Sequence, residues 1–309
     1  MKRTFTLLLL FLLVAGADLS AQQDPLYSQY MFNPLAINPA WAGSREMMNG
    51  ALLMRRQWTG FPGAPATNVF ALSAPTRKGK VGWGLEINTD QIGPKRSSAF
   101  YLSYAYRVRI GKGKLAFGLG AGVVNYKINW NEIEYRDQND VFASLSAKNY
   151  TVPDVKFGLY YNTKRFYVGL STTHLNTQTI ELVSTAAGNY FTQFKRHLFF
   201  TFGRAFELSE NVVFSPSVML RTLPGTSNTN VDLNLNFQLR KTIWAGVSLR
   251  SERTVVAMVQ YNAGQLLRIG YSYDLALGRL RGVQSGSHEL MLGFNLDIFK
   301  SETLSPRYF

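Results

Sequence analysis

The 309-residue chain contains no cysteine, which excludes disulfide bonds and any thiolate metal site. Charged residues are also few, at 17% of the chain, and acidic residues are the scarcer sign, with 19 Asp and Glu against 33 Lys and Arg. Beyond the N-terminus there is no run of about 18 apolar residues, so we expect no transmembrane helix. The chain is instead rich in hydrophobic residues, at 46%, which excludes a disordered or low-complexity protein.

The N-terminus has the features of a secretory signal peptide. Lys2 and Arg3 precede the apolar run Leu7–Val14, and small residues then lead to Ala21. This order predicts a signal peptide over residues 1–21, with cleavage after Ala21. Because no cysteine follows it, a lipoprotein anchor is excluded. An exported protein has no access to chromosomal DNA, so the formal charge of +14 does not indicate nucleic acid as a partner.

The rest of the chain shows alternation of apolar and polar residues with a period of two, which is typical of strands with one buried and one polar face. From Val231 to Arg240, every odd position is apolar and every even position is polar. The pattern recurs over residues 98–110, 266–275 and 289–298. A soluble sandwich also alternates, but it would be roughly half this length per domain and would seldom have strands of ten or more residues.

Fourteen segments of this kind can be counted, and most are near the nine to eleven residues that a tilted membrane strand needs. They cover about 49–58, 66–74, 80–90, 97–110, 113–127, 154–162, 165–173, 194–206, 211–222, 231–240, 242–250, 254–262, 266–275 and 288–298. Two positions fit less well. Val123–Val124 breaks the phase of its strand and suggests a bulge, and Pro216 would remove a ladder hydrogen bond.

The connections between these segments give an independent test, because outer-membrane barrels have short periplasmic turns and long external loops. Every even-numbered connection is short, and the long ones, such as 128–153 and 174–193, are all odd-numbered. We therefore predict an all-β, antiparallel transmembrane β-barrel of about 14 strands over residues 49–298, integral to the outer membrane, with a periplasmic tail over 299–309. Positions facing the lumen can be small, as Gly118, Gly120 and Gly122 are.

Groups that could carry catalysis are scarce. None of the three histidines is spaced as a metal pair, and the glycine-rich stretch 118–122 precedes an alternating strand rather than the helix of a phosphate-binding loop. A serine hydrolase would need a histidine such as His197 to face a serine at the lipid surface. We predict a protein that is not an enzyme, with no catalytic residue, no cofactor and no metal.

The segment before the first strand, residues 22–48, differs from the rest. It contains DPLYSQYMFNPLAINPAWAG, in which two Asn-Pro dipeptides interrupt regular structure and several aromatic residues cluster. So many aromatic side chains need to be buried. They pack into the lumen as a plug, or they dock on a periplasmic partner. The candidate residues are Tyr27, Tyr30, Phe32, Asn33, Pro34, Asn38, Pro39 and Trp41.

This segment resembles the N-terminal signature of the PorP/SprF family, which comprises outer-membrane barrels of the type IX secretion system and, in some members, of gliding motility. The resemblance continues at SPS (215–217), VDLNLNF (231–237), WAGV (244–247), GYSYD (270–274), GSHE (286–289) and SPRYF (305–309). It covers nearly the whole chain after residue 21, and Pro216 belongs to one of these motifs. Residues 128–193 match no such motif.

The resemblance implies a non-enzymatic function in type IX secretion or gliding. Such a barrel would couple the outer membrane to periplasmic ring components, or would support the export or anchoring of a surface protein. The implied partners are the ring lipoprotein and its associated periplasmic protein, a peptidoglycan-binding protein and a surface adhesin, besides membrane lipid and lipopolysaccharide. The alternative is a transport channel, either a porin or a carrier of hydrophobic substrates, since fourteen strands are wide enough to enclose a lumen.

Overall fold

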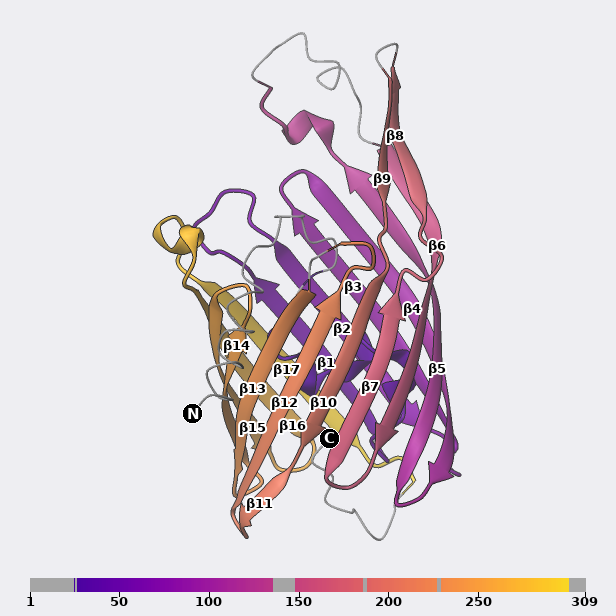
Figure 1. Ribbon diagram of the computed structural model, residues 1–309, viewed down its shortest axis with the longest axis vertical. Helices are drawn as coiled ribbons and strands as arrows, with labels where there is room; N and C mark the ends of the chain where they lie inside the picture. Colours follow the sequence, from indigo (N-terminus) through magenta and orange to yellow (C-terminus); the bar gives the residue numbers. More distant parts are fainter. Residues whose placement is uncertain (1–24, 26, 136–147, 186–187, 227–228, 300–309) are drawn as a thin grey trace, which may run out of the picture.

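A computed structural model describes residue 25 and residues 27–135, 148–185, 188–226 and 229–299. The predicted signal peptide and residues 300–309 of the predicted tail lie outside these residues. The described part forms one large antiparallel sheet that closes into a barrel of tilted strands (Figure 1). None of the helices within the described ranges is long and apolar enough to cross a membrane.

The barrel wall consists of strands that follow one another along the chain. These are β1 (Met48–Arg56), β2 (Ala66–Pro75), β3 (Val81–Ile92), β4 (Lys95–Ile110), β5 (Gly113–Ile128), β6 (Lys148–Asn162), β7 (Phe166–Thr173), β10 (His197–Arg204), β11 (Phe206–Ser209), β12 (Val212–Thr222), β13 (Thr229–Leu239), β14 (Ile243–Arg250), β15 (Thr254–Ala263), β16 (Leu267–Ala276) and β17 (Ser287–Leu296). The sheet closes because β1 pairs with β17 and β10 pairs with both β7 and β12. Closure leaves no unpaired edge strand in hydrocarbon.

The short strand β11 is a continuation of β10, so the wall contains fourteen strands. Gly203 pairs with Ser217 and Phe206 pairs with Phe214, so the register against β12 is unchanged across the break. The break lies opposite Pro216, which has no N–H to donate to the ladder. The predicted barrel of fourteen strands is confirmed, and each predicted segment corresponds to one strand. The largest difference in bounds is at β6, which begins at Lys148 rather than near residue 154.

The alternation in sequence corresponds to two faces of the wall. In β13, Leu233, Leu235 and Phe237 are exposed on the outside, whereas Asn234 and Asn236 are buried on the inside. An apolar outer face is what contact with lipid requires. Outer-membrane strands with this alternation need only one apolar face, which explains why the chain is hydrophobic without any long apolar run.

The bulge that we predicted at Val123–Val124 does not form. The pairing of β5 with both β4 and β6 is continuous through this point, with Val123 exposed on the outside and Val124 buried on the inside. The phase is therefore regular. The alternation changes its appearance because the inward positions change from glycine, in the first half of β5, to the larger Val124 and Tyr126 in the second half.

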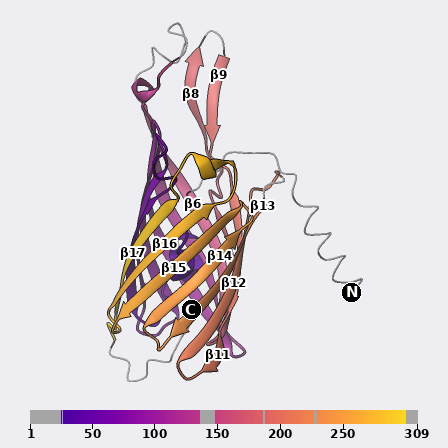
Figure 2. The same cartoon turned by 90° about the vertical axis from the view of Figure 1, so that its left-hand side faces the viewer.

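The two ends of the barrel differ (Figure 1). We call the end with the connections 76–80, 111–112, 163–165, 240–242 and 264–266 the turn end, and the opposite end the loop end. The connections 57–65, 174–196 and 277–286 lie at the loop end. An additional hairpin there, β8 (Thr179–Thr185) with β9 (Gly188–Gln193), projects beyond the wall (Figure 2). It falls within the connection that the sequence predicts over residues 174–193, so the hairpin itself is not predicted.

We expect the turn end to face the periplasm, as in other outer-membrane barrels. Because the chain has no cysteine, Ser285→Cys at the loop end and Ser209→Cys at the turn end form a matched pair of exposed, nearly isosteric substitutions. A membrane-impermeant maleimide added to intact cells should label the Ser285 variant and not the Ser209 variant. Labelling of the Ser209 variant alone would invert the orientation.

Candidate functional site

The N-terminal segment, defined here as residues 27–44, lies inside the barrel and folds into three tight turns. These are the 3-10 helices η1 (Tyr30–Phe32), η2 (Pro34–Ala36) and η3 (Pro39–Trp41). A proline at the first helical position needs no N–H partner and has its φ angle already set for the turn. Asn38 caps η3, because its side-chain oxygen accepts a hydrogen bond from the Ala40 N–H at 2.9 Å. The two Asn-Pro dipeptides therefore start turns and keep the segment compact.

The N-terminal segment runs from the loop end of the lumen to the turn end. At its beginning, the Ser28 hydroxyl donates to Asp274, which lies near the loop end of β16, at 2.7 Å. At its end, the Gly43 N–H donates to the Ser73 hydroxyl, near the turn end of β2, at 2.6 Å. Just beyond it, Lys114 pairs with Glu46 at 3.2 Å. The segment thus passes along the lumen before β1 begins.

Glycines of the wall lie directly against the N-terminal segment. A Cβ atom placed on Gly118 of β5 would overlap the backbone of Ala40, and one on Gly82 of β3 would overlap the carbonyl of Ala42. On Gly158 of β6, the added atom would overlap the amide of Asn38. The backbone of the segment can approach the wall this closely only because these inward positions carry no side chain.

The aromatic candidates are buried among lumen-facing side chains. Trp41 is 2% exposed and packs in a cluster with Leu35 and Tyr160. Phe32 is 7% exposed and meets the ring of Trp244 edge-on, at 5.7 Å between centroids. Burial of each such side chain is worth roughly 1.5–3 kcal/mol.

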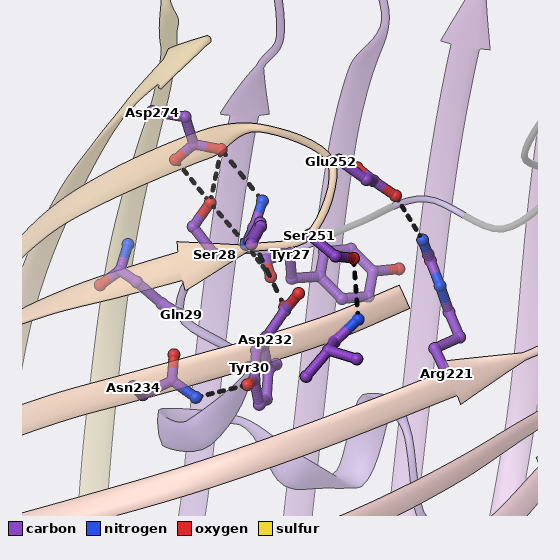
Figure 3. A network of polar contacts seen from close by, with 12 residues as sticks. Tyr27, Ser28, Gln29, Tyr30, Arg221, Asp232, Asn234, Ser251, Glu252 and Asp274 are labelled. Carbon is purple, nitrogen blue, oxygen red and sulfur yellow. Dashed lines mark hydrogen bonds and ion pairs between the residues drawn. The ribbon is translucent and has the colours of Figure 1, made fainter. Parts of the chain in front are cut away.

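Tyr30 and Tyr27 join this apolar packing to polar groups of the wall. Tyr30 is 4% exposed, and its hydroxyl accepts a hydrogen bond from the Asn234 amide at 2.6 Å (Figure 3). Tyr27 is half-buried, and its carbonyl accepts from Arg250 at 3.0 Å. The segment is therefore fixed by directional contacts as well as by apolar burial.

The Asn-Pro residues are also placed in the lumen. Asn38 donates to the carbonyls of Leu159 and Leu170 at 3.0 and 3.4 Å, which ties η3 to β6 and β7. Asn33 and Pro39 are buried, and Pro34 is partly buried. All eight candidate residues thus lie inside the barrel, where the wall covers most of their surface.

A group of five charged residues holds the beginning of the N-terminal segment. We call it the ion cluster, and it consists of Arg55, Asp232, Arg250, Asp274 and Glu289. Arg55 lies 2.7 Å from Asp274 and 3.4 Å from Glu289. Arg250 lies 3.2 Å from Asp274 and 3.4 Å from Asp232. All five side chains are buried.

The segment itself completes the ion cluster. The backbone N–H groups of Ser28 and Gln29 donate to Glu289 at 2.8 and 2.7 Å. The Ser28 hydroxyl donates to Asp274 (Figure 3). It also accepts a hydrogen bond from Arg55 at 2.8 Å. Three carboxylates face two guanidinium groups, so these donors of the segment supply part of the stabilisation that the excess negative charge requires.

Asp232, Asp274 and Glu289 occupy the polar faces of the alternating segments 231–240, 266–275 and 289–298, whereas sequence reasoning missed Arg55 and Arg250. Arg55 and Arg56 are adjacent charged residues in the first predicted strand, and in the structure Arg55 points inward and Arg56 is exposed. The available signal for Arg250 was its polar position in the alternating strand β14, whereas β1 alternates poorly and gave no such signal for Arg55.

The contacts of the N-terminal segment extend around the whole circumference. It touches β1, β16 and β17 through Ser28, and β2, β3, β4 and β5 through the stretch 40–43. It contacts β6 and β7 through residues 37–38. Tyr30 and Ile37 pack against β10 and β12. Tyr30 and Phe32 contact β13, β14 and β15. Every one of the fourteen strands therefore contacts this segment.

A cavity lies beside the N-terminal segment toward the loop end. Apolar residues, among them Ile37, Val124 and Met219, line it together with Glu86 and Lys156, which pair at 2.9 Å. His197 is buried inside the barrel rather than at the lipid surface, which does not fit the hydrolase alternative. Within the described residues, no three metal-binding side chains of His, Cys, Asp or Glu come together.

The fold is similar to that of known outer-membrane channels. The monoaromatic hydrocarbon channel CymD is 13% identical, with a TM-score of 0.50 over 90% of this chain and 95% of that one. The toluene transporter TodX of P. putida is 10% identical, with a TM-score of 0.50 over 87% of this chain and 95% of that one. At such identities the likeness concerns the fold alone, and it agrees with an integral outer-membrane protein.

Comparison of the sequence with protein families identifies the protein more specifically than the similarity of fold does. No curated protein matches the sequence. The family model described as type IX secretion system membrane protein PorP/SprF matches residues 19–294, which includes the N-terminal segment and nearly all of the wall. The chain therefore belongs to the PorP/SprF family of type IX secretion system membrane proteins.

Proposed function

We propose that this protein is a closed barrel that anchors the type IX secretion machinery in the outer membrane, and that the N-terminal segment is its plug. The observation that carries this proposal is the contact of that segment with all fourteen strands from inside the lumen. A solute channel needs a continuous aqueous path. Here Trp41, Phe32 and Tyr30 are buried inside the lumen, together with the ion cluster.

The proposal also concerns the partners. A barrel that does not conduct can still act through its two ends, which are the parts that lie outside the bilayer. On this proposal, the turn end contacts the periplasmic ring lipoprotein and its associated protein, or a peptidoglycan-binding protein. The loop end, where β8 and β9 project, is available to a surface adhesin during export or gliding. Neither role requires a catalytic residue or a cofactor.

Two measurements on the full chain test this function. Reconstituted in a planar bilayer, the purified protein should show no stable ionic current, because the segment fills the lumen. Affinity purification from outer membranes in mild detergent should recover other type IX components in defined ratios. A steady current from the unmodified protein, with no type IX component recovered, would contradict the proposal.

The cavity beside the segment favours one alternative, a channel for small hydrophobic molecules. Its apolar lining would suit such a solute, and the similar structures are described as hydrocarbon channels and a toluene transporter. Uptake of toluene into cells that produce the protein, compared with cells that lack it, separates the two functions. Faster uptake would favour the channel, and equal uptake would favour the anchor.

A further inference from the structure

Basic residues at the turn end are concentrated on one side of the barrel. We call this side the basic arc, and it covers the turns between β2 and β3, between β4 and β5, and between β6 and β7. Its members are Arg77, Lys78, Lys80, Arg109, Lys112 and Lys164, all of which are exposed. Because β2 to β7 are consecutive neighbours in the sheet, these six positive charges lie along one continuous arc of the rim.

The charges of the basic arc are not neutralised within the described part of the chain. None of its six members takes part in an ion pair there, whereas two other basic residues near the arc and one at the loop end are paired with a glutamate. Lys114 pairs with Glu46, and Arg165 pairs with Glu207. At the loop end of β4, Arg96 pairs with Glu132 at 3.0 Å. The basic arc is therefore a surface of unbalanced positive charge.

The far side of the turn end has a smaller excess, because the exposed basic residues Arg204, Arg240 and Lys241 lie there together with the exposed acidic residues Glu210 and Asp297. The turn between β15 and β16 consists of Gly264, Gln265 and Leu266, and the chain leaves β17 at Asp297. Lipid headgroups surround a barrel on all sides, so a belt for binding phospholipid would be expected around the whole rim. A charge excess concentrated in one arc instead fits a partner that approaches from one side.

We infer that the basic arc is the docking surface for a periplasmic protein that presents a cluster of carboxylates. This inference rests on the proposed anchoring function and adds the location and the chemistry of the contact. Long-range attraction between opposite charges would steer the partner to the rim, and the contact would weaken as salt is raised.

Charge reversal at two sites tests the basic arc. The arc variant is Arg77→Glu/Lys112→Glu, and the matched control is Arg240→Glu/Lys241→Glu, which reverses one Arg and one Lys in the exposed turn between β13 and β14. With the protein in discs of neutral lipid and poly-L-glutamate as the probe, the arc variant should raise the Kd about tenfold. In cells, the arc variant should reduce secretion of type IX clients, and the control should leave it unchanged.

A charge-conserving variant, Arg77→Lys/Lys112→Arg, should behave as the unmodified protein in both assays. Equal loss of secretion in the arc variant and the control would overturn the inference, since location would then not matter. So would normal secretion in an arc variant that no longer binds poly-L-glutamate. In either of those cases the closed-barrel anchor would still stand, because bilayer conductance and co-purification test it separately.

A lipid role gives a different result. If the basic arc binds headgroups, phosphatidylglycerol in the discs should raise the thermal midpoint of the unmodified barrel but not that of the arc variant. That outcome would overturn docking of a protein and assign the basic arc to the membrane.

Discussion

Gly118→Val should convert the closed barrel into one that conducts ions. The inward side chain of a valine at this position overlaps the backbone of Ala40, so η3 has to leave its place against β5. The strand itself should form, because valine is favoured in strands. We expect the current in a planar bilayer to rise from the baseline of the unmodified protein to stable open events.

The control for Gly118→Val is Ala121→Val, three residues along the same strand but on the outer, lipid-facing side. It adds a comparable apolar volume where no part of the N-terminal segment is near, so the current should stay at the baseline. Both variants should still shift in mobility on a gel when heated, which reports a folded barrel. A Gly118→Val barrel that is folded but conducts no current would show that the segment closes the lumen without the close contact between Gly118 and Ala40.

Strand positions could be predicted from the sequence because the membrane imposes a pattern on them. One face of each strand contacts lipid and the other faces the lumen. The alternation of apolar and polar residues therefore indicates which residues form each strand and which side of the wall each side chain faces. The predicted segment 211–222 thus corresponds to Val212–Thr222, even with Pro216 inside it. The hairpin of β8 and β9 was missed because it projects beyond the wall, where lipid imposes no alternation.

The residues of the N-terminal segment predicted that it is buried, but they did not predict whether the barrel lumen or a partner protein buries it. Aromatic side chains between Asn-Pro dipeptides indicated burial, and both a lumen and a partner surface would provide it. The small inward residues of β5 were visible in the sequence, but the neighbour that requires them was not, since Gly118 contacts a segment about eighty residues away in the sequence. The ion cluster was beyond reach because its members lie on β1, β13, β14, β16 and β17 and meet only when the barrel closes.

Glu289→Met should be among the most destabilising single substitutions in the chain. It removes the acceptor for Ser28 and Gln29 and one of the two carboxylates beside Arg55, all of them buried. Each buried N–H left without an acceptor typically costs about 1–3 kcal/mol, and Arg55 keeps Asp274 as its only carboxylate partner. The measurement is the free energy of unfolding by urea in lipid vesicles. The matched control is Glu46→Met, which breaks the more exposed pair with Lys114 and should cost about 0–1 kcal/mol.

The double variant Arg55→Met/Glu289→Met separates the ion pair from the rest of the cluster. If part of the loss in Glu289→Met arises because Arg55 loses one of its two carboxylate partners, removing that guanidinium as well should restore part of the stability, because apolar side chains replace both charges. Asp274 keeps Arg250 as a partner at 3.2 Å in this variant. We therefore expect the double variant to lose clearly less than the sum of the two single variants. Strictly additive losses would mean that Arg55 and Glu289 stabilise the segment independently, and that the cluster does not act as one unit in holding the plug.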